Sequence, residues 1–316
     1  MIRFYALSRR SRRARSLTLR TSAKVNLVLE VLGKRGDGYH ELSTVLQAVD
    51  LFDRLVLEED EALTLRTSDP ALPTDEANLV VKAARLLMEA AGVNRGARIT
   101  LEKRIPVAAG LGGGSSDAAA ALWGLNRLWG LRWSGARLAD LAVALGMDVP
   151  FFLSGGRARA TGRGERIEPL PASPALSLVL VKPDFPLSTR EVYGLVPAGL
   201  RDDGRRTKGL MQALASRDSS RVAASLYNAL EAVVEPAHPQ IGRIKRALMS
   251  AGALGSVMSG SGPTVLAVAR SADHARQIRD RVTTASRLAW AVRTLAAPAI
   301  RVVKSSLSLR GGRGPG

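Results

Sequence analysis

The strongest constraint in the chain is a glycine-rich segment that runs directly into an alanine-rich helix pattern. Residues 106–117 read PVAAGLGGGSSD, and AAAAL follows at once. The four glycines at 110, 112, 113 and 114 allow the backbone to approach a ligand closely and to take up positive φ angles. Two serines then open a helix, predicted from about Ser115 to Trp129, whose free N–H groups and positive dipole end favour an anion. The segment therefore predicts a loop that binds the phosphates of a nucleotide.

This loop differs from two familiar phosphate-binding motifs. No Lys-Ser or Lys-Thr pair follows the last glycine where the Walker A motif requires one. The GxGxxG arrangement with an acidic partner in a βαβ unit, typical of dinucleotide binding, is not convincing here either. A purely structural turn capped by serine is the alternative interpretation, but four glycines and two serines directly before a helix are hard to explain structurally alone.

The composition excludes several classes of protein. The chain has 316 residues, 46% of them hydrophobic, so it can build a core in one large or two medium domains. It has no cysteine, which excludes disulfides, a thiolate nucleophile and cysteine-ligated metals. Its three histidines (His40, His238 and His274) are too scattered for a local metal-ligand spacing. The apolar runs fall short of the roughly 18 residues of a membrane span, so we expect a cytoplasmic protein with no membrane partner.

The net charge of +18 lies mainly at the two ends of the chain. Residues 1–20 hold seven arginines and residues 291–316 hold five basic residues, with no acidic residue in either range. Removing these twelve from the 46 basic residues leaves 34 against 28 acidic ones, a net charge of +6 for residues 21–290. Aromatic residues, 4% of the chain, do not interleave with the basic ones as base stacking requires. We therefore expect no specific nucleic-acid partner; a basic nucleic-acid-binding protein is the alternative of another class.

Hydrophobic periodicity predicts a mixture of strands and helices. Apolar residues alternate at period two between Leu17 and Val31, as in a strand with one buried face. Helical spacing begins after Asn78, and another helix is predicted from about Gln240 to Ser250. Because the strands and helices do not follow regular βαβ spacing, we predict an α+β fold.

The domain organisation follows from proline and charge patterns. The prolines in 169–174 indicate a boundary between an N-terminal domain at 16–170 and a C-terminal domain at 171–300. Residues 1–15 share their arginine and serine content with transit peptides, but an extended or misplaced start upstream of a bacterial domain is the simpler interpretation. We expect this extension to be disordered, and residues 301–316 to form a loose, basic, glycine-rich tail.

Four motifs together resemble the GHMP kinases. The glycine-rich segment follows that family's phosphate-loop pattern Pro-x-x-x-Gly-Leu-Gly-Ser/Gly-Ser-Ser. The other three motifs are SAKVNL at 22–27 with GDGYHEL at 36–42, LGMDVPFF at 145–152 and SGSGPT at 259–264. The Asp-Gly-Tyr-His box is typical of one branch of the family, which phosphorylates a cytidine-diphosphate derivative of methylerythritol. The motifs run in order and the resemblance extends from about residue 17 to 285.

The resemblance implies a fold and a function. The expected fold has an N-terminal nucleotide-binding α+β domain and a C-terminal ferredoxin-like α+β domain. The expected reaction is ATP-dependent phosphorylation of the 2-hydroxyl of the cytidyl substrate, with ADP released, in the non-mevalonate route to isopentenyl diphosphate. A GHMP kinase for another alcohol, of the homoserine or mevalonate type, is the alternative.

Two residues are expected to carry the chemistry. Asp148 follows Gly-Met and precedes Val-Pro, where a loop would expose it at a cleft, and the family makes it the catalytic base. Its alternative role is the N-cap of the following turn. Lys24 stands in a strand with one buried face, where a lysine is costly unless it meets a carboxylate or phosphate. The family pairs this lysine with the aspartate; a solvent-facing strand lysine is the alternative.

The resemblance also assigns the substrate end of the site. Asn26 lies two residues after Lys24, on the same strand face, and is expected to hydrogen-bond the substrate. Tyr39 and His40 follow a glycine turn and are expected to stack on the cytosine and to read its edge. Thr189 aligns with a threonine at the erythritol end. A second glycine loop is expected to close on the diphosphate side through Gly260, Ser261 and Gly262.

The ATP side completes the expected site. Its loop residues are Pro106, Val107, Ala108, Ala109, Gly110, Leu111, Gly112, Gly113, Gly114, Ser115 and Ser116. Asn78 and Lys103 fall where the family lines the adenine side, although Asn78 is also a good helix N-cap. ATP is the expected co-substrate, with Mg²⁺ bound to it, and no residue is assigned as a protein ligand of the metal.

The chain departs from the family pattern at Ser22, where the family usually has proline. We expect this change to alter the entry to the strand and to leave the assignment of Lys24 intact. The basic extension precedes the point where the family normally begins. A monomer or a weak homodimer is expected.

Overall fold

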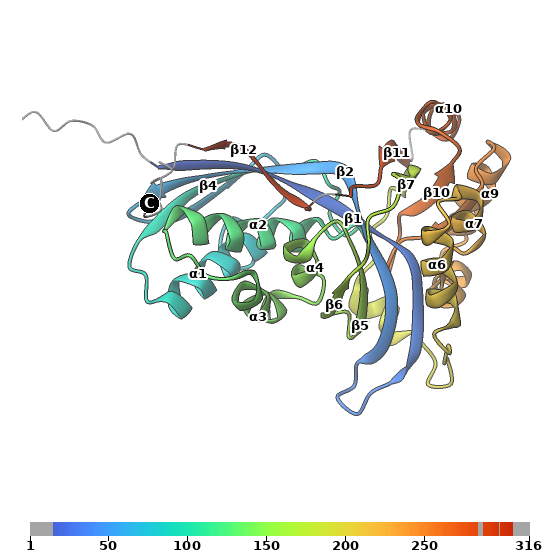
Figure 1. Cartoon of the computed structure of the whole chain (residues 1–316), viewed down its shortest axis with the longest axis horizontal. Helices are drawn as coiled ribbons and strands as arrows, with labels where there is room; N and C mark the ends of the chain where they lie inside the picture. The colour runs from blue at the N-terminus through green and yellow to red at the C-terminus, as the bar shows by residue number, and fades with distance from the viewer. Residues whose placement is uncertain (1–14, 284–286, 297, 306–316) are drawn as a thin grey trace, which may run out of the picture.

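The computed structural model describes residues 15–283, 287–296 and 298–305. It has the predicted α+β fold, with two sheets joined by a long hairpin that extends from one into the other (Figure 1). Disorder is predicted for residues 1–15, of which residues 1–14 lie outside the described residues, as does the part of the predicted tail at 306–316. The prediction is wrong for Arg15, because its carbonyl oxygen accepts a hydrogen bond of 3.1 Å from the N–H of Glu59.

The first sheet is built on two long strands, β1 (Ser16–Lys34) and β2 (His40–Asp60). Its main strand order is β12-β1-β2-β4-β3, while β5 and β8 pair with β2 and β1, and β6 pairs with β5. The bounds of these strands are Leu63–Thr67 (β3), Gly96–Glu102 (β4), Arg157–Gly162 (β5), Arg166–Pro169 (β6), Tyr227–Asn228 (β8) and Ile300–Ser305 (β12). The helices beside this sheet are α1 (Leu79–Ala91), α2 (Gly113–Leu128), α3 (Gly135–Leu145) and α4 (Val149–Ser154) (Figure 1).

The second sheet confirms the expected ferredoxin-like domain. Its strands pair antiparallel in the order β11-β7-β10-β9, and along the chain they alternate with two helices as β-α-β-β-α-β. That unit consists of β7 (Ser177–Pro183), α9 (Gln240–Ser250), β9 (Gly255–Met258), β10 (Val265–Ala269), α10 (Ala272–Val282) and β11 (Arg287–Arg293). The connection from β7 to α9 contains α5 (Thr189–Gly194), α6 (Arg205–Ala215), α7 (Ser219–Ala224) and α8 (Glu231–Ala237).

The hairpin of β1 and β2 ties the two halves together. Leu17 and Leu19, near the start of β1, pack in the core beneath α1 and α2. Leu29 and Val31, near its end, pack in the core of the second sheet. Most side chains of β1 are consequently buried on both faces, rather than on one face as the alternation predicts.

Two local predictions are wrong at chain segments that tertiary contacts decide. Residues 301–305 are not a loose tail, because Ile300–Ser305 forms strand β12 against β1 and supplies an edge of the first sheet. Ser22 lies within β1, not at its entry, at a bulge where its N–H donates to the carbonyl oxygen of Ala299 over 3.1 Å. A proline there has no N–H to donate.

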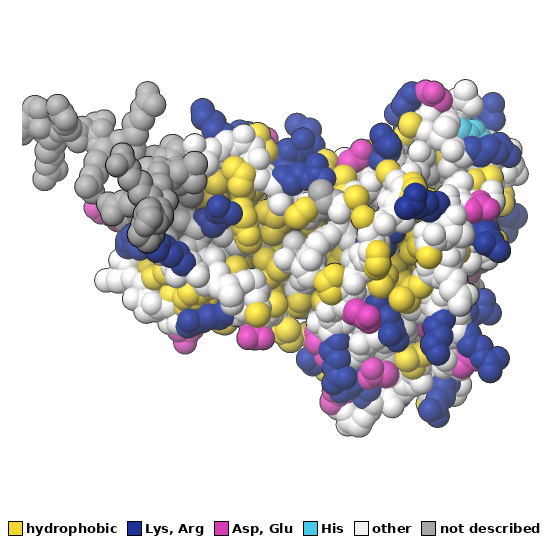
Figure 2. Space-filling view, in the orientation of Figure 1, with side chains coloured by type: hydrophobic (Ala, Val, Ile, Leu, Met, Phe, Trp, Pro, Cys, Tyr) yellow, Lys and Arg dark blue, Asp and Glu magenta, His cyan; other side chains and the backbone are white. Residues whose placement is uncertain are grey.

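Charged side chains do not gather in one stripe on the face shown in Figure 2. Lys and Arg side chains are spread over many elements, with Asp and Glu among them. Within the described ranges, no helix combines the length and the apolar character that crossing a membrane requires.

Candidate active site

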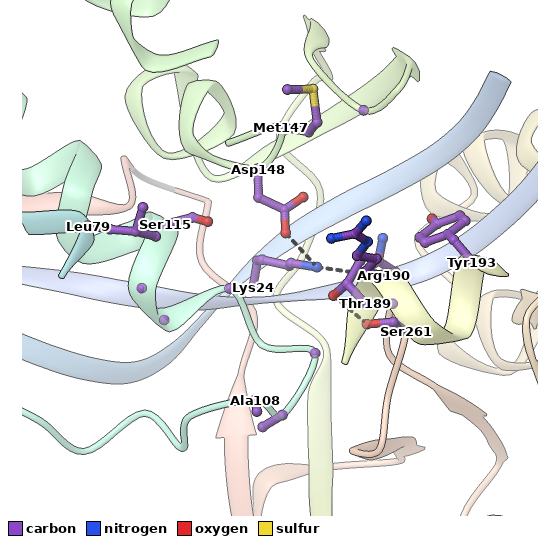
Figure 3. Close-up of a pocket in the computed structure, with 18 of the residues that line it drawn as sticks. Lys24, Leu79, Ala108, Ser115, Met147, Asp148, Thr189, Arg190, Tyr193 and Ser261 are labelled. Carbon is purple, nitrogen blue, oxygen red and sulfur yellow. Dashed lines mark hydrogen bonds and ion pairs between the residues drawn. The ribbon is translucent and has the colours of Figure 1, made fainter. Parts of the chain in front are cut away.

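A cavity of about 1250 Å³ lies between the two halves of the molecule. Its wall combines the start of α2 and the loop before it, the β1–β2 hairpin, the residues before α4, the start of α5 and the loop after β9. Segments far apart in the sequence therefore meet around one space (Figure 3).

Lys24 and Asp148 form an ion pair in this cavity, with Lys24 Nζ 3.1 Å from Asp148 Oδ2 (Figure 3). The Lys24 side chain is 5% exposed and that of Asp148 is 36% exposed, so the carboxylate is the partner open to a ligand. Lys24 therefore does not take the solvent-facing position of a lone strand lysine. Asp148 occupies the N-cap position of α4 but makes no capping hydrogen bond with its side chain, which leaves the carboxylate free for other partners.

Asn26 lies on the same face of β1 as Lys24, as period two predicts. Its Oδ1 accepts a hydrogen bond of 2.9 Å from Lys24 Nζ, and its Nδ2 donates to Thr44 Oγ1 over 2.8 Å. The backbone N–H of Asn26 donates to Ser259 Oγ, which donates in turn to the carbonyl oxygen of Gly110, each over 3.2 Å. Strand β1, the phosphate loop and the second glycine loop are thus held in one network.

Two glycines of the phosphate loop are required by close approach. Gly110 has φ +73°, and a Cβ there would lie 2.3 Å from the carbonyl oxygen of Ser259. Gly112 has φ +67° at the N-cap of α2, and its Cβ would lie 2.9 Å from Cγ of Lys24. Because these glycines have no side chain, the loop can pack directly against the second glycine loop and the Lys24 side chain.

The first turn of α2 starts two residues earlier than predicted, at Gly113, and its serines have different environments. Ser115 lines the cavity, whereas Ser116 is buried and donates from Oγ to the carbonyl oxygen of Ser22 over 2.6 Å. Leu111 is also buried, and neither Leu111 nor Ser116 is part of the cavity wall. The remaining predicted loop residues, from Pro106 to Ser115, line it.

Lys103 lines the cavity between two buried carboxylates. Its Nζ pairs with Asp53 Oδ2 and lies 2.9 Å from Asp117 Oδ2. Burial lowers the pKa of Lys103, but the two carboxylates outweigh this effect and raise it overall. Burial raises the pKa of Asp117 well above its usual range, against the opposing influence of Lys103. Asp117 lines the cavity, and its Oδ1 is buried and has no hydrogen-bond partner among the residues that the structure describes.

Asn78 combines a structural role with a position in the cavity wall. Its Oδ1 accepts from the N–H of Val80 over 2.9 Å and caps α1, while its Nδ2 donates to the carbonyl oxygen of Pro73 over 2.8 Å. The N-cap interpretation is therefore confirmed. Because Asn78 also lines the cavity, its position remains compatible with a contact to the nucleotide.

Aromatic side chains gather at the end of the cavity formed by the β1–β2 turn. Tyr39 is 53% exposed, and the guanidinium of Arg163 lies 5.0 Å from its ring centroid. The rings of His40 and Tyr193 lie 5.6 Å apart, tilted by 30°. His40 Nε2 is buried and has no hydrogen-bond partner in the described part of the chain. Burial, followed by the positive charge of Lys34, lowers the pKa of His40. The site thus offers planar aromatic surfaces, with the imidazole of His40 beside them in the cavity wall.

The start of α5 and the second glycine loop meet near the Lys24–Asp148 pair. Thr189 Oγ1 and Ser261 Oγ lie 2.9 Å apart and share a hydrogen bond (Figure 3). Gly260 and Ser261 line the cavity, whereas Gly262 does not. Tyr193, Arg163 and Arg190 line it as well, and the sequence analysis missed them. The one sequence feature that indicates Arg190 and Tyr193 is their position within about one helical turn after Thr189.

No group of three or more His, Asp or Glu residues within the described ranges could hold a metal ion. The Asp117 side chain in the cavity wall is 3% exposed and its Oδ1 is buried, so this carboxyl does not present an open oxygen to a cation carried by a nucleotide.

The fold and this site define a GHMP kinase, and residues 78–156 and 210–287 match the N-terminal and C-terminal domains of that class. Over 279 residues the chain is 50% identical to 4-diphosphocytidyl-2-C-methyl-D-erythritol kinase of Symbiobacterium thermophilum, an overlap of 86% of this chain and 98% of that relative. The chain belongs to the 4-diphosphocytidyl-2-C-methyl-D-erythritol kinase family.

Other comparisons agree with this placement. The chain is 49% identical over 267 residues to the kinase of the same name from Pelotomaculum thermopropionicum, covering 84% of this chain and 93% of the relative. A crystal structure of 4-(cytidine 5'-diphospho)-2C-methyl-D-erythritol kinase, 38% identical, superposes with a TM-score of 0.77 over 88% of this chain and 99% of the other. Homoserine kinase from Cytophaga hutchinsonii has a TM-score of 0.74 over 96% of this chain and 100% of the other at 21% identity, which shows a shared fold alone.

Proposed function

We propose that this protein transfers the γ-phosphoryl group of ATP to the 2-hydroxyl of 4-diphosphocytidyl-2-C-methyl-D-erythritol. The products are the 2-phosphate and ADP, and the reaction belongs to the non-mevalonate route to isopentenyl diphosphate. The observation that carries the proposal is the Lys24–Asp148 pair, 3.1 Å apart, in a cavity bounded by a phosphate loop on one side and aromatic rings on the other. The membership of the chain in the kinase family supports the same reaction.

In this mechanism, Asp148 and Lys24 act on the acceptor hydroxyl. Asp148 takes the proton as the hydroxyl oxygen forms its bond to the γ-phosphorus and the bond from that phosphorus to the β-phosphate oxygen breaks. Lys24, held by Asn26 at 2.9 Å, orients the carboxylate and offsets the negative charge that develops during transfer. Positioning and charge stabilisation are the main contributions that phosphoryl transfer asks of a protein.

The nucleotide would occupy the side of the cavity formed by the phosphate loop. The backbone from Gly110 to Ser115 and the N-terminus of the sixteen-residue helix α2 offer N–H groups to its phosphates. Asn78 and Lys103 would border the nucleotide on the same side. Mg²⁺ would arrive bound to ATP and neutralise part of the triphosphate charge, on the side of the cavity that Ser115 lines.

The cytidyl substrate would occupy the opposite side. Tyr39 offers an exposed ring for stacking, and His40 lines the same end of the cavity, where its imidazole would read the edge of the cytosine. Asn26 and Thr189 lie near the acceptor end, where the network of Ser261 and Gly260 borders the cavity. Gly262 would act by shaping this loop, because it stands outside the cavity wall. The cytoplasmic location, the monomeric or weakly dimeric state and the absence of a specific nucleic-acid partner stay predictions.

The experiment that tests the proposal measures ADP release from Mg-ATP with three acceptors in parallel. We expect ADP to be released when 4-diphosphocytidyl-2-C-methyl-D-erythritol is the acceptor, and no ADP release above background with homoserine or mevalonate. Activity on either of the other acceptors would keep the kinase class and refute the assigned substrate. No ADP with any acceptor, while ATP still binds, would refute the assigned chemistry.

A further inference from the structure

Arg190 is a cation of the cavity wall that the mechanism above does not use. It is the second residue of α5, and its side chain points into the cavity, with the Lys24–Asp148 pair on one side and Tyr193 on the other (Figure 3). The side chain is exposed and forms no hydrogen bond or ion pair within the described part of the chain.

Most other cations of the wall already have carboxylate partners. Lys24 pairs with Asp148, Lys103 with Asp53 and Asp117, and Arg163 with Glu165 at 3.8 Å. Lys34 has no carboxylate partner among the described residues, but its backbone pairs across the hairpin with that of His40, so Lys34 lies at the aromatic end. Arg190 thus provides an unpaired positive charge between the aromatic end and the reacting pair.

Arg190 lies between the aromatic end of the cavity and the Lys24–Asp148 pair, and the charge of Asp148 influences the aromatic end. The pKa of Tyr193 is raised by burial and, second, by the negative charge of Asp148. A cytidyl substrate that spans from the rings to Asp148 must carry its diphosphate through this interval. The negative charge of that diphosphate would be repelled by the carboxylate of Asp148, and a cation between them would offset this repulsion.

We propose that Arg190 binds the diphosphate of the cytidyl substrate and so selects diphosphate-linked acceptors over uncharged ones. The inference rests on the proposed function and deepens it. A guanidinium is suited to this role because it presents parallel N–H donors that match two phosphate oxygens at once. Arg190 acts here as a specificity-determining residue for the acceptor, while the phosphate loop holds the triphosphate of ATP.

The test compares two competitors that differ only in the diphosphate. Inhibition constants of cytidine 5'-diphosphate and of cytidine are measured against 4-diphosphocytidyl-2-C-methyl-D-erythritol at saturating Mg-ATP, so that the nucleotide site is filled. We expect the wild-type protein to bind the diphosphate more tightly than the nucleoside. In Arg190→Gln this preference should fall by about 10- to 100-fold, the range of a lost hydrogen-bonded charge pair, with cytidine bound as before.

Three further variants make the result specific. Arg190→Lys keeps the charge without the paired donors and should retain part of the preference. Lys34→Gln removes the unpaired cation at the aromatic end and should leave the preference near that of the wild type. Arg243→Gln removes an exposed charge on α9 outside the cavity and should change neither inhibition constant.

Several outcomes would overturn the assignment to Arg190. One is an unchanged preference for cytidine 5'-diphosphate over cytidine in Arg190→Gln. Another is an equal loss of that preference in Lys34→Gln, which would indicate that any positive charge in the cavity attracts the diphosphate. A lower kcat with an unchanged preference would place Arg190 on the transferred phosphoryl group instead. If the wild-type protein neither phosphorylates the cytidyl acceptor nor binds cytidine 5'-diphosphate, the proposed function itself fails, and that result is distinct from failure of the variant alone.

Discussion

Lys24 Nζ lies 3.1 Å from Asp148 Oδ2, and the two side chains differ sharply in their exposure. The buried lysine is fixed by Asn26, whereas the aspartate keeps a face toward the cavity. A salt bridge of this kind orients the carboxylate without covering it. The relationship therefore favours a proton-accepting role for Asp148 rather than a purely structural ion pair.

Replacing Asp148 by Asn should abolish most turnover while ATP binding persists. The amide keeps the size of the side chain but cannot accept the proton, so we expect kcat to fall by about 10²- to 10⁴-fold, the usual contribution of a general base. Steady-state ADP release and equilibrium ATP binding measure the two effects. Asp140→Asn, an exposed change on α3 outside the cavity, is the matched control and should behave like the wild type. Near-normal kcat in Asp148→Asn would refute the mechanism.

Gly110→Ala should damage both the stability and the activity of the protein. The new Cβ would lie 2.3 Å from the carbonyl oxygen of Ser259, so the two glycine loops would have to separate. The alanine would also have to adopt the backbone angle φ +73°, which is strained for a residue with a side chain. We expect a loss of about 1–3 kcal/mol in the free energy of unfolding, the order of a backbone strain, together with a raised KM for ATP. Urea denaturation and ADP release measure these quantities.

Gly135→Ala is the control for that substitution. A Cβ at Gly135, the first residue of α3, meets no described atom within 4 Å, so stability should be unchanged or slightly higher. If Gly110→Ala were as stable and active as Gly135→Ala, the close packing of the two loops would not matter for the site.

Lys103→Met should destabilise the fold strongly. The variant removes the cation between Asp53 and Asp117, both of which are buried, and leaves two carboxyl groups without a counter-charge. We expect the free energy of unfolding to fall by about 3–5 kcal/mol, as for other broken buried pairs. Lys208→Met, an exposed change on α6, should stay within about 0.5 kcal/mol of the wild type. A loss of less than about 0.5 kcal/mol in Lys103→Met would show that Lys103 does not stabilise the fold as the counter-charge of Asp53 and Asp117.

His40 should make the free energy of unfolding depend on pH below about 6.5. Burial, and then the charge of Lys34, lower the pKa of His40 below its usual 6.5, so the unfolded chain binds the proton more readily than the native one. The free energy of unfolding should therefore rise as pH increases toward 6.5, and this contribution should be constant above it. In His40→Gln the contribution disappears.

Thermal unfolding of the wild type and of His40→Gln across this pH range measures the effect. The difference in Tm between the two proteins should change below pH 6.5 and become constant above it. In parallel, protonation of His40 makes both of its ring nitrogens N–H donors and adds a positive charge, so the KM of the wild type for the cytidyl acceptor should change across the same range. The same pH profile of KM in both proteins would exclude His40 from substrate recognition.

The sequence determined those parts of the protein that depend on neighbouring residues. The glycines and serines from 110 to 116 specify a loop and a helix start, because backbone freedom and capping are local properties. The α9 boundaries at Gln240 and Ser250 and the N-cap role of Asn78 agree with the local pattern for the same reason. The motif order was sufficient for the family and the α+β class.

Only the tertiary structure decided which of these local features share a site and which serve the fold. Ser116 belongs to the same motif as Ser115, yet its hydroxyl bonds to strand β1 because the helix packs that side against the sheet. Residues 301–305 look like the start of a tail, yet they pair with β1, since a strand edge supplies partners that no nearby residue offers. Arg190 and Tyr193 carry no motif of their own, and the position of α5 at the cavity brings them into its wall. Such long-range contacts depend on the folded chain as a whole, and local patterns do not record them.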